Sequence, residues 1–467
     1  MSANIYIGMP VYQGSEFVAE AVQSIRNQTY GDFRLVMSVD GPEDSTVEAC
    51  RSLTSDPRIE MVVQPRRLGW PGNFNWLARH CDREYFCYWQ QDDLVSDDYL
   101  MVLHESQRAT PDTAIAYTDV QWFGERTDRD SAVDIDGTPF ERALQEIEAL
   151  HYVPLRGLVR ASMIPDRADP IPEVETSGHQ QEFVYLADLA AAGRFQRVSE
   201  GLYFKRAHRS NAHREWFAES GEARRDEWSA LGNGLIGVAE RTDPGANAAS
   251  LLAVVLDRLT IVRSGRGFWH APPQTPAGVS RSVREFLGRY PDRLRNTAGV
   301  DTLRSNGFER PVHSWVTSAI ATARRDLAFL DVLLRDADSD VTIETGNDDP
   351  GSLMLGRGWS TPEAWGVWTD SAVAEINLPP HRFARVELHG HPFAPDGPVR
   401  IGLSDGRGTI DFQEFSSECS IGIDLTGDDG ARAVVIHLPD ATSPHAAGVS
   451  VDQRTLGFEM RSITLRR

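Results

Sequence analysis

Two adjacent carboxylates, Asp92 and Asp93, close an apolar run in the segment CYWQQDDL, residues 87–94. Charged side chains beside a buried strand are costly unless water solvates them in a turn or a cation binds them. A third carboxylate, Asp40, follows the apolar residues 35–39 in the same way. The elements around these acidic residues must decide between a solvated turn and a binding site.

Short apolar strands alternate with amphipathic helices as far as about residue 213. Residues 5–9 and 35–39 are typical of buried strands, and apolar residues recur at helical spacing over residues 18–25 between them. This βαβ pattern predicts a parallel sheet, in which residues 85–89 form a later strand. Ligands of open α/β sheets bind at the carboxyl ends of the strands, where we expect Asp40 and Asp92 to converge on one crevice.

Helical periodicity dominates residues 215–335, and β alternation dominates residues 353–467. Frequent Gly, Pro and Asp turns predict a small β-sandwich in the last region. The residues expected to face one side of its strands are Ala384, Val386 and Leu388, and Val434, Ile436 and Leu438. The predicted domains are 1–214, 215–340 and 350–467.

Composition excludes several classes of protein. The formal net charge of -21 argues against nonspecific binding to nucleic acids or anionic membranes. The start of the chain lacks the basic and apolar regions of a signal peptide, and no apolar run is long enough to span a bilayer, so we expect a cytoplasmic protein. The four cysteines form no CxxC pair and predict neither a disulfide framework nor a zinc site.

Three segments resemble family 2 glycosyltransferases of the GT-A fold. MPVYQGSEFVAEAVQSIRNQTYGDFRLVMSVDGPEDST is similar to the family's opening, P-V-Y-N-G, N-Q-T-Y and D-D-G-S-x-D-x-T. RRLGWPGNFNWLARH is similar to N-x-G-x-x-x-x-x-N, and YWQQDDL occupies the place of D-x-D. The resemblance covers about the first 210 residues and implies an α/β, GT-A-type nucleotide-sugar-binding domain. The helical region would follow. The C-terminal segment GWSTPEAWGVWTD, residues 358–370, resembles a β-sandwich module attached to bacterial cell-surface polysaccharide glycosyltransferases.

The resemblance implies a nucleotide site at the first two strands. Asp40 aligns with the carboxylate that accepts a hydrogen bond from N3–H of uracil or thymine, and an ionised carboxylate is suited to such a donor. As a lone residue before Gly41, Asp40 is also typical of a turn. The other nucleotide-binding candidates are Pro10, Val11 and Tyr12, which would pack on the base, and Gln90 and Gln91.

A metal site is implied at the D-x-D position. Asp92 aligns with the carboxylate that ligates Mn²⁺ or Mg²⁺ at the donor diphosphate, and Asp93 would orient the loop or contact the donor sugar. Gln90 replaces the first Asp of the motif, which would lower the affinity for metal. His208, in a segment similar to L-Y-x-Y-R-x-H, would ligate the metal or bond a phosphate; its simpler interpretation is a partly exposed polar residue.

Glu182 is the candidate general base. LAAAGRF resembles the end of the family's E-D-x-x-x-x-x-R-L-A-x-x-G stretch, which places Glu182 at the catalytic Asp and replaces the usual E-D pair by Gln181-Glu182. A Glu on a helix surface would give the same pattern. The candidates for stabilising the diphosphate leaving group are Lys205, Arg206 and Arg209, with Arg66 and Arg67 as weaker ones that also fit a solvated pair.

The hypothesis is an inverting, metal-dependent hexosyl- or deoxyhexosyltransferase. It would move a sugar from a UDP- or dTDP-linked donor to a hydroxyl of a glycan or glycoconjugate in bacterial surface polysaccharide synthesis. Trp359, Trp365 and Trp368 would bind the acceptor glycan or fill the sandwich core. The alternative is a noncatalytic glycan-binding protein on a degenerate transferase scaffold. A nucleotidyltransferase is less favoured, because the first strand is not followed by the Gly-rich loop of that class. The helical region could supply a homo-oligomer interface.

Overall fold

The structure is a computed structural model whose described residues fall into two compact units. They are residues 4–42, 46–166, 169–174, 178, 180–208, 221–243, 248–261, 275–290, 292–293, 312–335, 339–346, 349–378, 383–406, 410–425 and 433–466. The first unit comprises Met1–Ala218 and Asn233–Pro244, and the second comprises Glu219–Gly232 and Gly245–Arg467. The division passes through helix α8, Gly221–Thr242.

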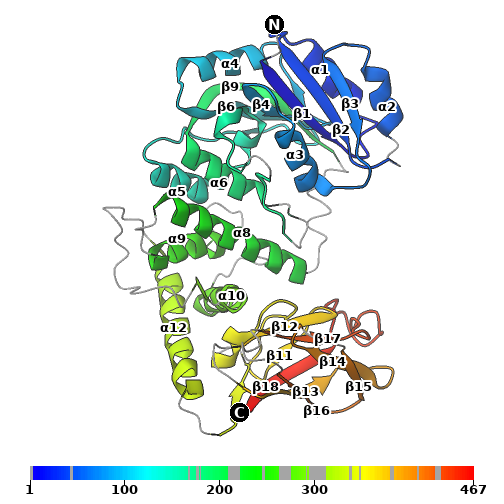
Figure 1. The fold of residues 1–467 in the computed structure, drawn as a ribbon, viewed down its shortest axis with the longest axis vertical. Coiled ribbons are helices and arrows are strands. Elements are labelled where there is room, and N and C mark those ends of the chain that lie inside the picture. The colour runs from blue at the N-terminus through cyan, green and yellow to red at the C-terminus, as the bar shows by residue number, and fades with distance from the viewer. Residues whose placement is uncertain are drawn as a thin grey trace. The chain divides into compact units, whose positions relative to one another are not determined.

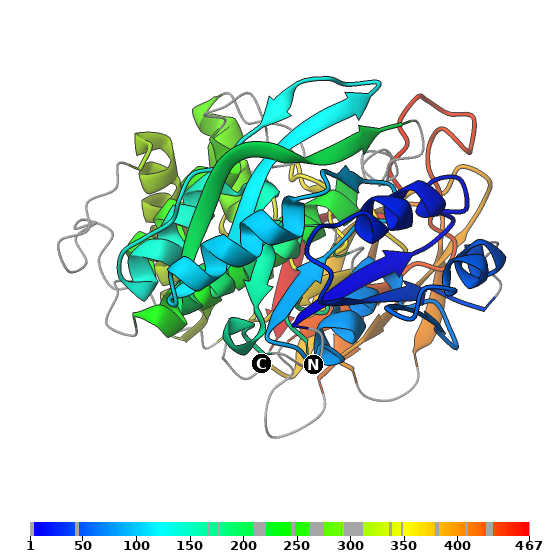
Figure 2. The same cartoon turned by 90° about the horizontal axis from the view of Figure 1, so that it is seen from above.

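A nine-stranded sheet forms the centre of the first unit, in the order β3-β2-β1-β4-β8-β6-β9-β5, with β7 beside β6. The four strands β3, β2, β1 and β4 run parallel, as predicted from the βαβ pattern. The strands are β1 Ile5–Val11, β2 Phe33–Val39, β3 Ile59–Val63, β4 Tyr85–Tyr88, β5 Leu94–Val95, β6 Thr113–Gly124, β7 Arg129–Asp130, β8 Leu158–Arg160 and β9 Arg194–Ala207. The long strands β6 and β9 lie side by side (Figures 1 and 2) and pair in parallel over most of their length.

The helices of the first unit have the expected amphipathic pattern. Those wholly within it are α1 Val18–Arg26, α2 Thr46–Leu53, α3 Gly69–Arg79, α4 Tyr99–Ala109, α5 Pro139–Ala149 and α6 Glu182–Ala192. Val18, Val22 and Ile25 of α1 are all buried, which confirms the predicted helical face. Helix α3 packs so closely on β1 that a Cβ on Gly8 would lie 3.0 Å from Cβ of Leu77, so this strand position requires glycine or a local shift.

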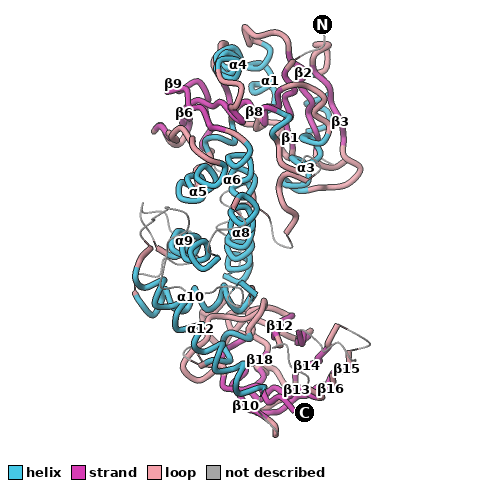
Figure 3. Tube along the Cα trace, turned by 60° about the vertical axis from the view of Figure 1, so that its left-hand side comes forward, coloured by secondary structure: helices cyan, strands magenta, loops and turns pink. Residues whose placement is uncertain are grey.

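The second unit combines helices with two antiparallel sheets. Figure 3 shows its helices in cyan and its strands in magenta. Its helices are the first part of α8, α9 Ala248–Thr260, α10 Pro276–Arg289 and α12 Ser314–Arg335. One sheet has the order β10-β18-β13-β16 with β11 beside β18, and the other has the order β12-β17-β14-β15. The strands are β10 Val341–Glu344, β11 Val367–Trp368, β12 Val373–Asn377, β13 Arg385–Pro392, β14 Val399–Ser404, β15 Asp411–Phe415, β16 Cys419–Asp424, β17 Ala433–His437 and β18 Phe458–Arg466.

The predicted β region is confirmed, with one error in its alternation. Val386, Leu388, Val434 and Ile436 are fully buried, as their spacing predicts. Ala384 is exposed, because it precedes β13 and lies outside the regular alternation of that strand. Leu330 and Leu334 of α12 share one apolar cluster with the sandwich residues. Among the described residues, no helix is long and apolar enough to cross a membrane.

Candidate active site

The candidate residues gather at the carboxyl ends of the parallel strands. Tyr12 follows β1, Asp40 follows β2, and Gln90 to Asp92 follow β4. Because β1 lies between β2 and β4, the three loops are neighbours along one edge of the sheet. This is the edge at which open α/β sheets bind ligands.

Asp40 is anchored to the start of helix α3. Its Oδ1 accepts the backbone N–H of Leu68 at 2.6 Å, and its Oδ2 accepts the backbone N–H of Gly69 at 3.0 Å. A negative charge at a helix N-terminus is stabilised by the unpaired amides and the helix dipole. An ionised carboxylate only accepts hydrogen bonds, which is the property that suits Asp40 to a base N–H. Asp40 therefore shapes this loop as well as lying where the base is expected.

A cation, Arg67, lies beside Tyr12. The sequence made Arg67 only a weaker candidate for stabilising the diphosphate. The guanidinium of Arg67 lies over the Tyr12 ring, 4.1 Å from its centroid. Arg67 is exposed, whereas Val11 is fully buried in β1. The predicted packing of Val11 on a base would therefore have to be made from within the sheet edge, because its side chain is not at the surface. Pro10 and Tyr12 keep partly exposed side chains.

Gln91 joins the loop after β4 to the loop after β1. Its side-chain Oε1 accepts the backbone N–H of Tyr12 at 2.9 Å, and its Nε2 donates to the backbone carbonyl of Tyr12 at 2.8 Å. A Cβ on Gly14 would lie 2.1 Å from this Oε1, so glycine there makes room for the amide. We therefore describe Gln91 as a residue that holds the two loops together.

Asp92 and His208 lie close enough to share a ligand. Nε2 of His208 is 2.9 Å from Oδ2 of Asp92, and the His208 ring packs on Phe17 with 4.6 Å between centroids. Both side chains are partly exposed. Helix α1 begins next to Phe17, so the loop after β1, the loop after β4 and the end of β9 meet here.

A divalent cation fits the chemistry of this pair. One carboxylate oxygen and one imidazole nitrogen are common protein ligands, and cations of the Mg²⁺ type are usually completed by substrate phosphates and water. Within the described ranges there is no group of three or more His, Cys, Asp or Glu side chains placed to hold a metal. A cation at Asp92 and His208 would therefore depend on a ligand such as a diphosphate.

Asp93 has a supporting position. It is fully buried; its Oδ2 accepts the Tyr203 hydroxyl at 2.8 Å, and its Oδ1 accepts the backbone N–H of Arg206 at 2.9 Å. Burial raises the pKa of Asp93, and the nearby Lys205 ammonium opposes that change. Of the two predicted alternatives, orienting the loop fits these contacts, whereas contact with a donor sugar does not.

Arg206 is held by protein groups. Its guanidinium pairs with Glu20, donates to the backbone carbonyl of Asp92 at 2.9 Å, and lies between the rings of Phe17 and Phe123. The side chain of Arg206 therefore fixes the loop that carries Asp92, which weakens its case as a phosphate ligand. Arg209 lies outside the described residues.

Lys205 is a buried cation of the site, as is Arg156. Its side chain is 4% exposed, and its Nζ donates to Oε1 of Gln90 at 3.2 Å. The ammonium also lies 5.2 Å from the centroid of the Trp122 ring and 5.9 Å from that of Tyr152. Burial and the neighbouring Arg156 lower the pKa of Lys205, while carboxylates at this sheet edge favour the charged form.

Glu182 opens helix α6 within electrostatic reach of the same cluster. It raises the pKa of Lys205, as do Asp93 and Asp92, and so partly offsets the effects of burial and Arg156. Burial raises the pKa of Tyr88, and both Glu182 and Asp92 raise it further against the effect of Arg156. Glu182 and Asp92, far apart in the chain, thus act on the same two groups, Tyr88 at the end of β4 and Lys205.

The sequence did not predict the aromatic and basic side chains that surround Lys205. Trp122 and Tyr152 both bind Oδ2 of Asp130, and Arg156 lies beneath Tyr152, 5.1 Å from its ring centroid. One signal was available in the sequence: Lys205 is the only lysine of the chain, and every other basic residue among its 47 lysines and arginines is arginine.

The three C-terminal tryptophans have different environments. Trp359 is 3% exposed and donates its indole N–H to the carbonyl of Glu375 at 2.6 Å, so of its two predicted alternatives it fits the sandwich core and not glycan stacking. Trp365 is 46% exposed. Its ring meets Trp368 edge to face at 6.5 Å, and Trp368 meets Phe393 in the same way at 6.2 Å. We call Trp365, Trp368 and Phe393 the aromatic cluster.

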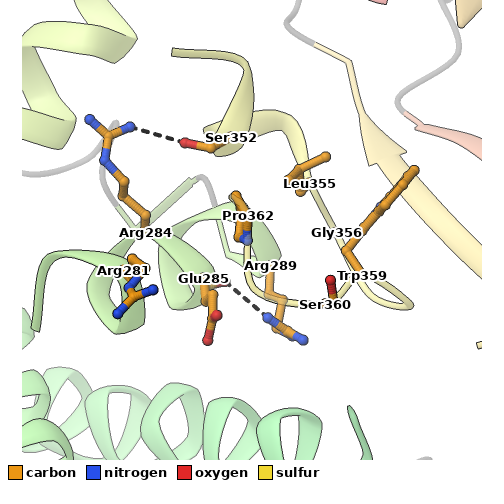
Figure 4. Close-up of a pocket in the computed structure, with 10 residues that line it drawn as sticks. All are labelled: Arg281, Arg284, Glu285, Arg289, Ser352, Leu355, Gly356, Trp359, Ser360 and Pro362. Atoms are coloured by element: carbon orange, nitrogen blue, oxygen red, sulfur yellow. Dashed lines mark hydrogen bonds between the residues drawn. The ribbon is translucent and has the colours of Figure 1, made fainter. Parts of the chain in front are cut away.

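A pocket in the second unit lies beside helix α10 (Figure 4). Arg284 donates to Oγ of Ser352 at 3.1 Å and pairs with Asp326. Arg289, also on the lining, pairs with Asp226 at 2.9 Å. Since acidic partners balance both guanidinium groups, these two residues give the pocket no net positive charge, and no ligand class follows from it.

Comparison with known proteins gives the class of the first unit. Residues 6–163 match the family described as glycosyl transferase family 2. The glycosyltransferase GlyG of Streptococcus pneumoniae is 26% identical over 106 residues, which are 22% of this chain and 35% of that protein. An uncharacterized glycosyltransferase of Haemophilus influenzae is 26% identical over 97 residues, 21% of this chain and 39% of that protein. The chain thus spans just over a third of the length of these curated relatives.

These matches confirm the predicted resemblance to family 2 glycosyltransferases over residues 6–163 of the N-terminal unit. The curled, mixed sheet, parallel from β3 to β4, with its covering helices confirms the α/β class of the GT-A type, and the helical region and all-β C-terminal part are confirmed as well. Residues 1–349 of TarS from S. aureus, solved in complex with UDP-GlcNAc, are 15% identical with a TM-score of 0.49; the match covers 70% of this chain and 87% of that one.

Proposed function

We propose that this protein is an inverting, metal-dependent glycosyltransferase. It would transfer a hexosyl or deoxyhexosyl group from a UDP- or dTDP-linked donor to a hydroxyl of a glycan or related acceptor in the synthesis of bacterial surface polysaccharide or glycoconjugate. One observation carries the proposal: a carboxylate suited to act as base, Glu182, lies in the same charged cluster as Asp92 and His208. The family 2 domain supports the reaction class.

In the proposed reaction Glu182 accepts the proton of the acceptor hydroxyl. The acceptor oxygen forms a bond to C1 of the donor sugar from the face opposite the diphosphate, and the bond from C1 to the diphosphate oxygen breaks. Inversion follows from this single displacement. Lys205 supplies positive charge from the protein for the departing diphosphate.

Asp92 and His208 would hold a divalent cation, Mn²⁺ or Mg²⁺. When bound, the cation would neutralise charge that develops on the diphosphate. Asp40 would accept the N–H of the base, and Arg67 on Tyr12 would bound the same pocket with donors for a base carbonyl. Uracil and thymine both present an N–H flanked by carbonyls, which is why UDP and dTDP are favoured.

Titration calorimetry tests the donor class. The full chain is titrated with UDP, dTDP and GDP, each with saturating Mn²⁺ and each with EDTA. Binding of UDP or dTDP but not GDP supports the proposal, and an Asp92→Asn protein should lose most of its affinity for Mn²⁺. Absence of binding by all three nucleotides in Mn²⁺ would refute a nucleotide-sugar transferase and leave the noncatalytic glycan-binding alternative.

Turnover then tests the base. With the preferred donor, Glu182→Gln is expected to lower transfer or donor hydrolysis by roughly 100-fold or more, the usual contribution of general base catalysis, while nucleotide affinity stays within a few fold. Asp188→Asn is a matched control, since Asp188 lies on the same helix and pairs with Arg241 at 2.8 Å. Full activity of the Glu182→Gln protein would remove Glu182 from the mechanism.

The aromatic cluster is a proposed contact for the acceptor glycan. Exposed tryptophan rings stack on the apolar faces of sugars, and Trp365 presents such a face. Trp359 is excluded from this role by its burial. The exposure of Trp365 also bears on the alternative function, a noncatalytic glycan-binding protein. In such a protein the aromatic cluster would be the proposed glycan contact.

A further inference from the structure

Two positions at which this chain differs from the motifs it resembles are in direct contact. Gln90 stands where D-x-D has its first Asp, and Lys205 stands where L-Y-x-Y-R-x-H has its second Tyr. They are 115 residues apart in the sequence, yet Nζ of Lys205 donates to Oε1 of Gln90 at 3.2 Å. The first change removes a negative charge, and the second adds a positive one. The site is therefore more positive by two charges than the motif pattern specifies.

The use of lysine at this position has a physical reason. Lys205 is the only lysine in the chain, and at all other Lys or Arg positions the residue is arginine. An ammonium is compact and has rotatable N–H donors, while a guanidinium is a wide planar fork. The space for the cation is bounded by the rings of Trp122 and Tyr152, whose centroids lie 5.2 and 5.9 Å from Nζ. A compact charge suits this aromatic wall.

The cation is also placed to do more than fill space. Burying a charge is costly unless hydrogen bonds and opposite charges compensate it. An ammonium has three N–H donors, and within the described part of the chain Gln90 provides the hydrogen-bond acceptor for Lys205. Asp92 and Glu182 lie near enough to favour its charged form. A dianionic ligand at Asp92 would find the remaining donors of Lys205 beside it.

We propose that Lys205, held by Gln90, is an internal counter-ion for the donor diphosphate and takes over part of the charge neutralisation that a divalent cation supplies. The nucleotide diphosphate then binds measurably without metal, and a metal at Asp92 and His208 adds to this binding. This inference rests on the proposed function, because it assigns a partner to the diphosphate of the same donor. It concerns the binding of the donor, not the identity of the sugar.

Metal-free binding is the decisive measurement. UDP, dTDP and inorganic pyrophosphate are titrated into the wild-type chain in EDTA by calorimetry. Lys205→Met is expected to weaken the metal-free binding by roughly 10- to 100-fold, the range for losing a hydrogen bond to a charged group. Gln90→Glu, which is nearly isosteric and leaves the lysine in place, should weaken it similarly by pairing with the ammonium, and should raise the affinity for Mn²⁺ measured without nucleotide.

The single lysine allows direct observation of the contact. Protein grown with ¹³C,¹⁵N-lysine gives side-chain NMR signals from Lys205 alone, and these are expected to shift when UDP or pyrophosphate is added in EDTA. Arg34→Met is the matched control for loss of one cation: Arg34 lies on β2 and bonds Glu60 at 2.7 Å, away from the carboxyl end of the strand. Its metal-free affinity should equal that of the wild type.

Three results would overturn the inference. Nucleotide binding that requires Mn²⁺ absolutely would show that Lys205 does not replace the metal charge, while the proposed function would stand. Unchanged metal-free affinity in both Lys205→Met and Gln90→Glu proteins would show that the pair is only structural. Absence of binding with Mn²⁺ as well as in EDTA would refute the proposed function together with this inference.

Discussion

Glu146 offers a test of how burial controls charge in the first unit. This residue of α5 is 1% exposed, and burial raises its pKa from 4.5 to about 8, against the effect of a backbone hydrogen bond from His151. The folded protein therefore holds a neutral carboxyl at pH 7, whereas the unfolded chain ionises it. The perturbation is Glu146→Gln, which keeps the shape of the side chain and removes its titration.

The magnitude follows from proton linkage. A pKa that moves from 4.5 to about 8 corresponds to roughly 5 kcal/mol, at about 1.4 kcal/mol for each pH unit. The folded state binds the proton more tightly, so the stability of the wild type falls as the pH rises from about 4.5 to about 8 and is constant beyond. At pH 7 roughly 3 kcal/mol of this loss is expressed, and Glu146→Gln should be more stable by about that amount.

Urea unfolding of the full chain at pH 5, 6, 7 and 8 measures the difference, and hydrogen exchange of the peptides covering α5 locates it in this unit. The stability gap between variant and wild type should widen with pH. Glu141→Gln is a control of opposite sign, because hydrogen bonds with Thr138 lower the pKa of Glu141. A gap that stays constant from pH 5 to 8, or a variant less stable at every pH, would refute the reasoning.

Two further predictions concern the loops and the tryptophans. Gly14→Ala should displace the Gln91 amide, since the new Cβ would lie 2.1 Å from its Oε1; nucleotide affinity measured by calorimetry should fall about tenfold with little change in unfolding. Gly31→Ala is the control, because its nearest contact would be 3.9 Å away, and an unaltered affinity in Gly14→Ala would remove Gln91 from the site. Trp359→Ala should destabilise the sandwich by about 3–5 kcal/mol, whereas Trp365→Ala should leave its stability nearly unchanged and weaken retention on immobilised oligosaccharide. Equal stability losses in the two tryptophan variants would contradict the assigned burial.

Several assignments could be made from local sequence because their physical cause is local. Short, largely apolar runs identify β1 and β2, which are buried on both faces, and helical spacing identifies α1, which buries one face. The carboxylate Asp92 lies in the loop that follows its strand, so its place at the sheet edge needs no tertiary information. The sandwich strands were recognisable for the same reason. Ala384 failed because alternation does not show where a strand begins.

Other assignments depend on partners that are distant in the sequence. From the sequence, Arg206 is a candidate to bind phosphate. In the fold it pairs with Glu20, which is 186 residues away in the chain. Trp359 and Trp365 have similar local surroundings, and only the packing of β12 and its neighbours buries the first and leaves the second exposed. No periodicity in the sequence distinguishes such cases.

The sequence by itself determined which kinds of chemistry are present: the order of strands and helices, the acidic residues at strand ends and the motif resemblance to family 2 glycosyltransferases. Only the tertiary structure decided how the charges are distributed among them. In the folded protein Lys205 donates a hydrogen bond to Gln90, and Arg206 forms an ion pair with Glu20. Both carboxylate oxygens of Asp93 accept hydrogen bonds from residues of β9. The physical reason is that hydrogen bonds and desolvation act over a few ångströms, and the groups that meet at this sheet edge come from segments far apart in the chain.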